Sequence, residues 1–269
     1  QALDQVADLA LTQQPRFTYR TALQAMALAE VNPRRYQSKI AHCAQWLVDQ
    51  QLTGGDWGYP GPPDGSYLRM DGVTVPPPPR PEGAPDAPLE KLVIERRTPI
   101  DKAGTVKGDF SNTQFAILGL RAARDAGIEI PKATWKAALD YLRKFQRPDG
   151  GWGYVMGGQP DEASYASLTC AGICSTAICQ AALGVKDVRG DAMVKKGLAW
   201  VRKHLDLERN ANVESSSLIG PRGWQYYHLY CVERVARVLG LADLEGRAWY
   251  PKGAAFLVAK QLPDGGWLD

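Results

Sequence analysis

The side chains that could hold a metal ion are few. Cys170 and Cys174 lie one helical turn apart in an apolar stretch, and His228 could approach them from a neighbouring apolar helix. Two thiolates and an imidazole are ligands that zinc accepts. Nothing in the spacing fixes their convergence, however, and cysteine is also a common small core residue. We therefore expect buried cysteines, no metal and no cofactor, and we expect His42 and His204 to be solvated on outer helices.

Two aspartates could act together as an acid and a base. Asp109 and Asp161 each precede an apolar helix and could face the same opening of the fold. Paired carboxylates hydrolyse sugar polymers, but an aspartate before a helix more often caps it, so we expect both to be N-caps. The chain has no Gly-x-Ser-x-Gly, P-loop, dinucleotide-binding or His-Glu-x-x-His motif that would indicate another chemistry.

The bulk composition excludes two classes of partner. The 269 residues are 45% hydrophobic and carry a net charge of +3, with no run of Lys and Arg that would indicate a nucleic-acid partner. Residues 163–185 are uncharged and long enough to span a bilayer, but their Ser, Thr and Gln content predicts a helix buried in protein. We expect no transmembrane segment. The chain starts at Gln1 without a charged and apolar leader, so the compartment stays open, including export after signal removal.

A repeated turn organises the chain. Three segments end an amphipathic helix at a Gln, make a Gly-containing turn and then reach a Trp: Gln51 to Trp57, Gln146 to Trp152 and Gln261 to Trp267. A worn fourth copy runs from Trp200 to Trp224 after a longer loop. Glycine supplies positive φ in such turns. We expect each Trp to pack in a fixed place and each Gln amide to bond nearby backbone groups.

The turns separate two kinds of helix. Amphipathic helices precede them and nearly apolar helices follow them, as in Phe115–Leu120 and Thr169–Cys174. Ser111–Gln114 fits a capping box at the start of one apolar helix. The expected helices cover residues 2–13, 17–31, 34–51, 111–126, 132–146, 163–184, 190–205, 224–240 and 247–261. Alternating outer and inner helices must close on a ring or stack in a solenoid, so the fold class is all-α.

The Gln-to-Trp turns resemble the QW motifs of squalene–hopene and oxidosqualene cyclases and the related turns of protein prenyltransferase β subunits. Asp109–Phe115 and Thr169–Gly172 are also similar to bacterial prenyltransferase/squalene-oxidase-repeat proteins with no assigned reaction. This resemblance implies an α/α toroid of helical hairpins, with an incomplete ring not excluded. It covers nearly the whole chain as one domain, residues 1–269. A Pro-rich insertion at residues 59–108 interrupts it, which we place at the mouth of the ring; residues 73–75 and 92–94 could form a short hairpin there.

The chemistry of that superfamily does not transfer to this chain. The cyclases protonate an alkene with an Asp-x-Asp-Asp acid, whereas this sequence has no two adjacent aspartates and so also lacks Asp-Asp-x-x-Asp. The prenyltransferases hold zinc with an Asp-x-Cys and a distant His. No Asp-x-Cys occurs here, and Asn112 falls where the His would be. Whether the protein is an enzyme is left uncertain.

The resemblance implies a central cavity lined by the inner helices. The candidate residues at its mouth are Asp109, Asn112, Gln114, Asp161, Tyr165, Cys170, Trp224, Tyr227 and His228. The residues assigned to the structural repeat are Gln51, Trp57, Gln146, Trp152, Gln261 and Trp267. We expect a non-cyclising binding or interaction module whose unidentified ligand is extended and apolar, or polymeric. The alternatives are a divergent terpenoid cyclase-like or polysaccharide-processing enzyme, and a structural domain of a larger protein.

The last repeat predicts an unpaired helix. After Trp267 no apolar inner helix follows, so the outer helix at 247–261 lacks its partner within this sequence. We expect an open seam near 2–13 and 247–261, filled by self-association, by another chain or by a continuation of the gene product.

Overall fold

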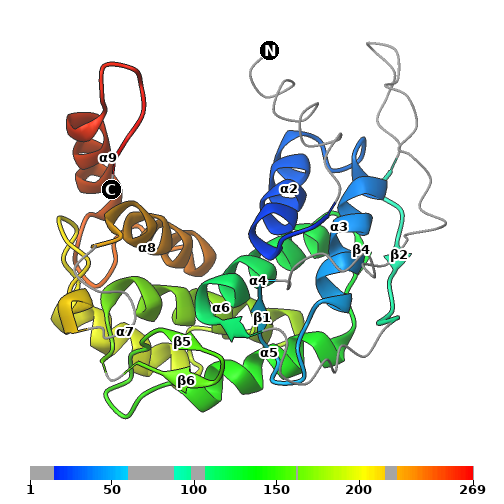
Figure 1. Cartoon of the computed structure of the whole chain (residues 1–269), viewed down its shortest axis with the longest axis horizontal. Helices are drawn as coiled ribbons and strands as arrows, with labels where there is room; N and C mark the ends of the chain where they lie inside the picture. The colour runs from blue at the N-terminus through cyan, green and yellow to red at the C-terminus, as the bar shows by residue number, and fades with distance from the viewer. Residues whose placement is uncertain (1–14, 60–87, 98–106, 162, 216–222, 269) are drawn as a thin grey trace. The chain divides into compact units, whose positions relative to one another are not determined.

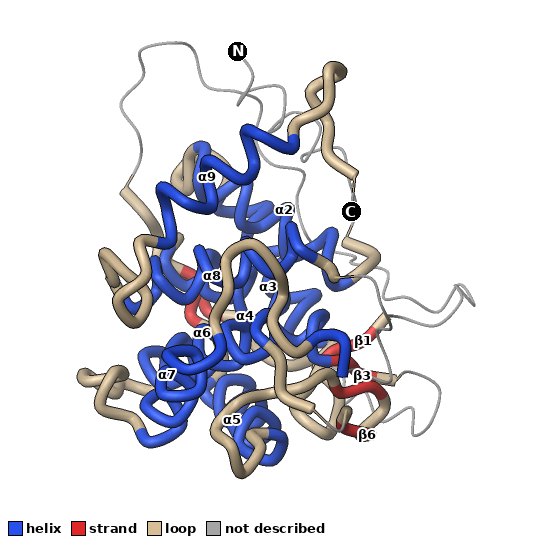
Figure 2. Tube along the Cα trace, turned by 90° about the vertical axis from the view of Figure 1, so that its left-hand side faces the viewer, coloured by secondary structure: helices blue, strands red, loops and turns tan. Residues whose placement is uncertain are grey.

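The computed structural model describes residues 15–59, 88–97, 107–161, 163–215 and 223–268. This part of the chain is mostly helical, as predicted, and its strands are only two residues long (Figures 1 and 2). The predicted helix at 2–13 and the predicted hairpin strand at 73–75 lie outside the described residues. The chain divides into two compact units, Gln1–Ala138 and Leu139–Asp269. The assignment to a single domain stays a prediction.

The first unit is built on three packed helices. They are α2 (Thr18–Val31), α3 (Gln37–Asp49) and α4 (Phe110–Asp125), and α2 packs against both of the others (Figure 1). Gly119 allows a close approach of α4 to α2, because a Cβ there would come within 2.8 Å of the Ala22 Cα. Strand β1 (Trp57–Gly58) pairs antiparallel with β3 (Gly108–Asp109), so the end of the first turn meets the start of α4.

Residues 88–97 form a strap along α3. Their strand β2 (Leu92–Val93) pairs parallel with β4 (Ile128–Glu129). Two buried glutamines of α3 tie the strap down: Gln37 exchanges hydrogen bonds with the Glu90 backbone, and the Gln45 amide donates to the Glu95 carbonyl at 2.6 Å. This part of the Pro-rich insertion therefore lies on α3, and the placement of the insertion at the mouth of a ring stays a prediction. The segment predicted to pair with strand β2, residues 73–75, lies outside the described residues.

The second unit is built around a nearly uncharged helix. Helix α6 (Ala166–Ala182) packs against α7 (Ala192–His204) and α8 (Gln225–Leu239), and α9 (Trp249–Lys260) lies beside α8. Almost every residue of α6 is buried, so the uncharged stretch at 163–185 is a core helix. No helix in the described ranges is long and apolar enough to cross a membrane.

Smaller elements complete the two units. Helix α5 (Lys132–Phe145) runs across the boundary between them. Strands β5 (Val155–Met156) and β6 (Gln159–Pro160) form an antiparallel pair, and a 3-10 turn occupies Val213–Ser215.

The observed helix ends differ from the predicted ends by a few residues. At α4 the difference has a physical reason: the helix begins at Phe110, and the Asp109 side chain caps it by accepting from the Asn112 backbone N–H. Ser111 is therefore already inside the helix, and the predicted capping box at Ser111–Gln114 is wrong.

The strap generates a prediction for Gln37. This side chain donates to the carbonyls of Glu90 and Ala126, both at 2.7 Å, and accepts from the Glu90 N–H. Gln37→Leu leaves these partly buried groups without partners, so it should cost about 2 kcal/mol of unfolding free energy. Hydrogen exchange at Leu92, whose N–H bonds to Gly127, should become faster. Gln159→Leu, at an exposed position, is the control. Equal unfolding free energies for the two variants would contradict this account of the strap.

Candidate functional site

Three turns share one set of hydrogen bonds. In each turn the Gln amide donates to the carbonyl four residues later, and the Trp indole N–H donates to a carbonyl ten residues earlier. The acceptors of the indoles are Leu47 for Trp57 (2.7 Å), Leu142 for Trp152 (3.0 Å) and Leu257 for Trp267 (2.8 Å). The acceptors of the Gln amides are Gly55 for Gln51 (3.0 Å), Gly150 for Gln146 (2.9 Å) and Gly265 for Gln261 (2.9 Å).

Glycine is required at one place in each turn. Gly55, Gly150 and Gly265 have φ of +88°, +92° and +84°, in the region that other residues avoid. In the first two turns a side chain would also clash, because a Cβ would lie 2.1 Å from the Ala137 carbonyl or 2.6 Å from the Lys196 carbonyl. The first turn therefore presses directly against α5, and the second against α7.

The first two turns also connect to the helices that follow them. The Gln51 amide donates a second bond to Thr134 of α5, and the Gln146 amide donates one to Met193 of α7. The Trp57 backbone N–H donates to the Thr113 hydroxyl at 3.1 Å, and Trp152 bonds to Thr169 in the same way. The first turn thus joins α3, α4 and α5, and the second joins α5, α6 and α7.

The third turn has the internal bonds but not the external ones. Within the described residues neither a second acceptor for the Gln261 amide nor an acceptor for the Trp267 backbone N–H is found. Trp152 is fully buried, whereas Trp267 is 43% exposed. Helix α9, which leads into this turn, has no buried residue. The turn therefore keeps its own bonds, and none to a following helix is found in the part of the chain that the structure describes.

The imperfect fourth copy of the repeat lacks the Gln-to-Trp turn, and a histidine bonds the preceding loop instead. Thr113 and Thr169 are the fourth residues of α4 and α6, and His228 is the fourth residue of α8. The His228 Nε2 bonds to the Asp206 carbonyl at 2.7 Å, which ties α8 to the loop after α7. Trp224, predicted to be the Trp of this copy, is 44% exposed and adopts a left-handed backbone before α8.

The predicted mouth residues of the first unit lie together at the start of α4. Asp109, Asn112 and Gln114 are buried. The Asp109 carboxylate accepts from the Ser111 hydroxyl (2.7 Å), the Asn112 N–H (2.8 Å) and the Asn112 amide (2.6 Å). Tyr59, which the sequence analysis did not select, lies close enough that burial and the Asp109 charge raise its pKa. The bonds to the carboxylate all come from the first turn of its own helix, which is a capping arrangement.

Of the predicted residues of the second unit, Tyr165 lies at the start of α6, and Trp224, Tyr227 and His228 lie at the start of α8. Asp161 is buried, but its backbone closes the β5–β6 loop by bonding Tyr154 and Arg147, and the N-cap of α6 is Tyr165. The expectation that Asp161 caps the inner helix is therefore wrong. Tyr227 is partly exposed on the first turn of α8. Asp109 and Asp161 fall in different units, so their action as a pair stays a prediction.

The cysteines are core residues. Cys170, Cys174 and Cys231 are buried on α6 and α8, and burial raises the pKa of the Cys170 thiol, with smaller contributions from the other two cysteines. A thiol that resists ionisation is a poor nucleophile and a poor metal ligand. Among the described residues no group of three His, Cys, Asp or Glu side chains could hold a metal ion.

One histidine departs from expectation. His204 is exposed, but His42 is largely buried on α3, where burial and the nearby charges of Lys39 and Arg97 lower its pKa to about 4. The prediction that His42 is solvated is wrong because the strap lies along this helix, a contact that no local pattern indicates.

An apolar cleft in the described residues lies between α8 and α9. Its volume is about 510 Å³, within the range of small-molecule sites. Both helices present residues at helical spacing to it, and the lining is mainly apolar and aromatic: Tyr226, Leu229, Tyr230, Val232, Glu233, Trp249, Tyr250, Gly253, Ala254, Leu257 and Val258. None of these residues was selected from the sequence, because their grouping depends on how two exposed helix faces meet.

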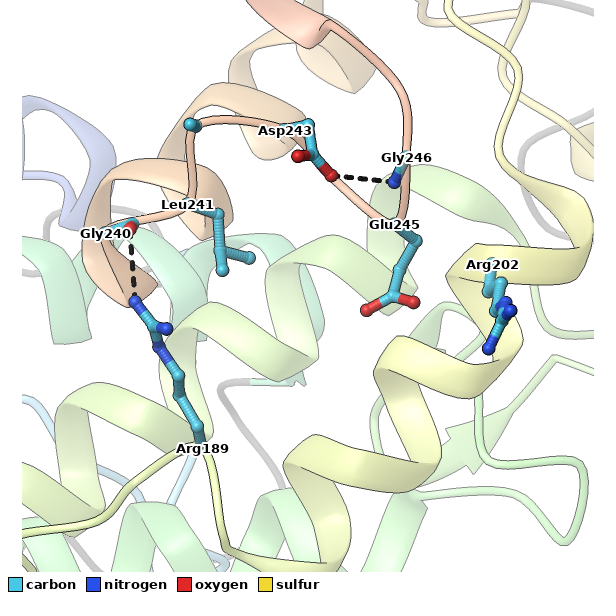
Figure 3. Close-up of a pocket in the computed structure, with 8 residues that line it drawn as sticks. Arg189, Arg202, Gly240, Leu241, Asp243, Glu245 and Gly246 are labelled. Carbon is cyan, nitrogen blue, oxygen red and sulfur yellow. Dashed lines mark hydrogen bonds between the residues drawn. The ribbon is translucent and has the colours of Figure 1, made fainter.

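A second pocket, of about 550 Å³, lies between Arg189 and Arg202 beside the loop that follows α8 (Figure 3). Arg189 points at the end of α8 and donates to the carbonyls of Leu239 and Gly240. Asp243 accepts from the Gly246 N–H at 2.7 Å. The hydrogen-bonding groups of Arg189 and Asp243 are thus already used to bond the backbone at the end of α8 and in the loop that follows it. For this reason we place the candidate site in the apolar cleft between α8 and α9.

Comparison with known proteins adds no relative: no protein-family model matches this chain, and no curated protein matches it either.

The repeated turns generate a paired prediction for stability. Trp152→Ala should cost about 3–5 kcal/mol of unfolding free energy, because it empties a fully buried site. Trp267→Ala removes the same indole hydrogen bond from an exposed turn and should cost about 1 kcal/mol or less. Urea melts of both variants test this. Equal losses of unfolding free energy would show that the indole hydrogen bond, and not the packing of the ring, sets the contribution of each tryptophan to stability.

His228 generates a prediction for pH. Burial lowers its pKa to about 4, although the bond to Asp206 opposes the shift. The unfolded chain takes up this proton near pH 6.5, so the stabilisation is complete above that pH and is lost as pH falls through 4. The loss of unfolding free energy should approach about 3 kcal/mol. His228→Gln, which can keep the bond to Asp206, should flatten this dependence in urea melts between pH 7 and 4, whereas the exposed His204→Gln should not.

Proposed function

We propose that this protein is a non-cyclising binding module of the squalene cyclase and prenyltransferase repeat superfamily, built as an α/α toroid, and that its α8–α9 cleft binds an extended apolar ligand. The observation that carries the proposal is the cleft itself, a hollow of about 510 Å³ between two helices with four aromatic side chains in its lining.

The repeat geometry supports the superfamily. Three turns share the bonds of Gln51, Gln146 and Gln261 and of the tryptophans that follow them, as expected for a repeated helical hairpin. Because Asn112 lies in the cap of α4 and bonds Asp109, it has a structural role at the place where a prenyltransferase carries its zinc ligand.

The chemistry around the cleft supports binding over catalysis. Its lining combines aromatic and aliphatic side chains with one charged residue, Glu233, which is ion-paired with Arg234 and Arg237. Protonating an alkene requires a strong, protonated acid in the site. The one carboxylate among the described lining residues is already engaged by two arginines, an arrangement suited to holding a ligand.

Ala254 offers a direct test because it lines the cleft. Ala254→Phe should fill the space and abolish binding of decyl methyl ether, an apolar probe, measured by equilibrium dialysis. Ala259→Phe adds the same ring to an exposed position of α9 outside the lining and should leave binding unchanged. Mass spectrometry of organic extracts should find an apolar compound with the native protein and not with Ala254→Phe. Equal binding by both variants would place the ligand elsewhere.

A further inference from the structure

We infer that the ligand of the α8–α9 cleft is an apolar alcohol whose hydroxyl group donates a hydrogen bond to Glu233. The inference rests on the proposed function and specifies the chemistry of its ligand. The inference starts from Glu233, because this is the only charged side chain among the described residues that line the cleft.

Glu233 is fixed in place by two arginines of its own helix. The Arg234 Nε contacts one carboxylate oxygen, and the Arg237 Nε lies 3.3 Å from the other. The Arg234 guanidinium is in turn seated over the Tyr230 ring, 5.3 Å from its centre. These contacts orient the carboxylate. A carboxylate has about four acceptor positions, so it can still accept a hydrogen bond from a molecule in the cleft.

The local charge favours a neutral donor. Both carboxylate oxygens of Glu233 already face an arginine, Arg234 on one side and Arg237 on the other. An alkylammonium ion would have to compete with these two cations for the same oxygens. An alkyl carboxylate would bring a second carboxylate against Glu233, the charged group that lines the cleft. A hydroxyl group needs only one remaining acceptor position and makes a charge-assisted hydrogen bond, which is stronger than a neutral one.

The two helices also orient the ligand. Tyr226 of α8 lies near Phe256 of α9, with 6.4 Å between ring centres, and a Cβ on Gly253 would lie 3.8 Å from Leu229. Residue numbers thus rise along α8 as they fall along α9, which places Glu233 at the Trp249 end of the cleft. The hydroxyl group belongs at that end, and the hydrocarbon lies toward Tyr226 and Leu257.

Equilibrium dialysis with four ten-carbon probes tests the inference: 1-decanol, decyl methyl ether, decanoate and decylammonium. The alcohol should bind about tenfold more tightly than the ether, which cannot donate, and more tightly than either ion. Glu233→Gln removes the charge and both ion pairs, so it should reduce the preference for alcohol over ether to about twofold. Glu208→Gln, at an exposed position outside the cleft, should leave the preference unchanged.

The outcomes separate this inference from the proposed function. Equal binding of alcohol and ether would overturn the hydroxyl assignment while the apolar binding site stands, and so would tighter binding of either ion. Binding of none of the four probes would overturn both proposals. Sedimentation equilibrium detects a competing occupant: a dimer that excludes 1-decanol would show that a second copy of the chain fills the cleft, which also overturns the inference.

Discussion

Each repeated turn is organised by the hydrogen bond from a tryptophan indole to a carbonyl in the last turns of the preceding helix. This bond fixes the direction in which the chain leaves each outer helix, as in Trp152 to Leu142. The glutamine of the same turn then bonds both its own loop and the next outer helix, as Gln146 does with Gly150 and Met193. Because the Trp152 backbone also bonds Thr169, one turn positions three helices. The polar groups of a sharp reversal are thereby paired inside the protein, where an unpaired group would be costly.

In the third turn, where no bond to a following helix is found among the described residues, only the turn and its own helix are affected. The third turn keeps its internal bonds, yet Trp267 and Val258 are exposed because no described helix covers them. The cleft that we propose as the ligand site opens along the same helix, α9. The proposed site therefore lies along the hairpin that the described residues cover least.

The helices could be predicted from sequence because apolar periodicity is a local property. The Gln-to-Trp turns could be found for the same reason, since all their internal bonds fall within a short segment. The strap could not be predicted, because its attachment to Gln37 and Gln45 joins residues about fifty positions apart and polar side chains give no pattern for it. The error at His42 has the same origin. The cleft was missed because Tyr226, Trp249 and Glu233 look like surface residues until two helices meet.

The locality of the turns bears on how the chain acquires its structure. The indole bond spans ten residues and the glutamine bond spans four, so each turn closes a small loop at little entropic cost. Contacts between residues close in sequence form quickly. Each helix end could therefore be set soon after its tryptophan leaves the ribosome, before the next hairpin has been synthesised. The bonds to Thr169 and Met193 would then form as those residues arrive, which makes assembly directional, from the amino to the carboxyl end.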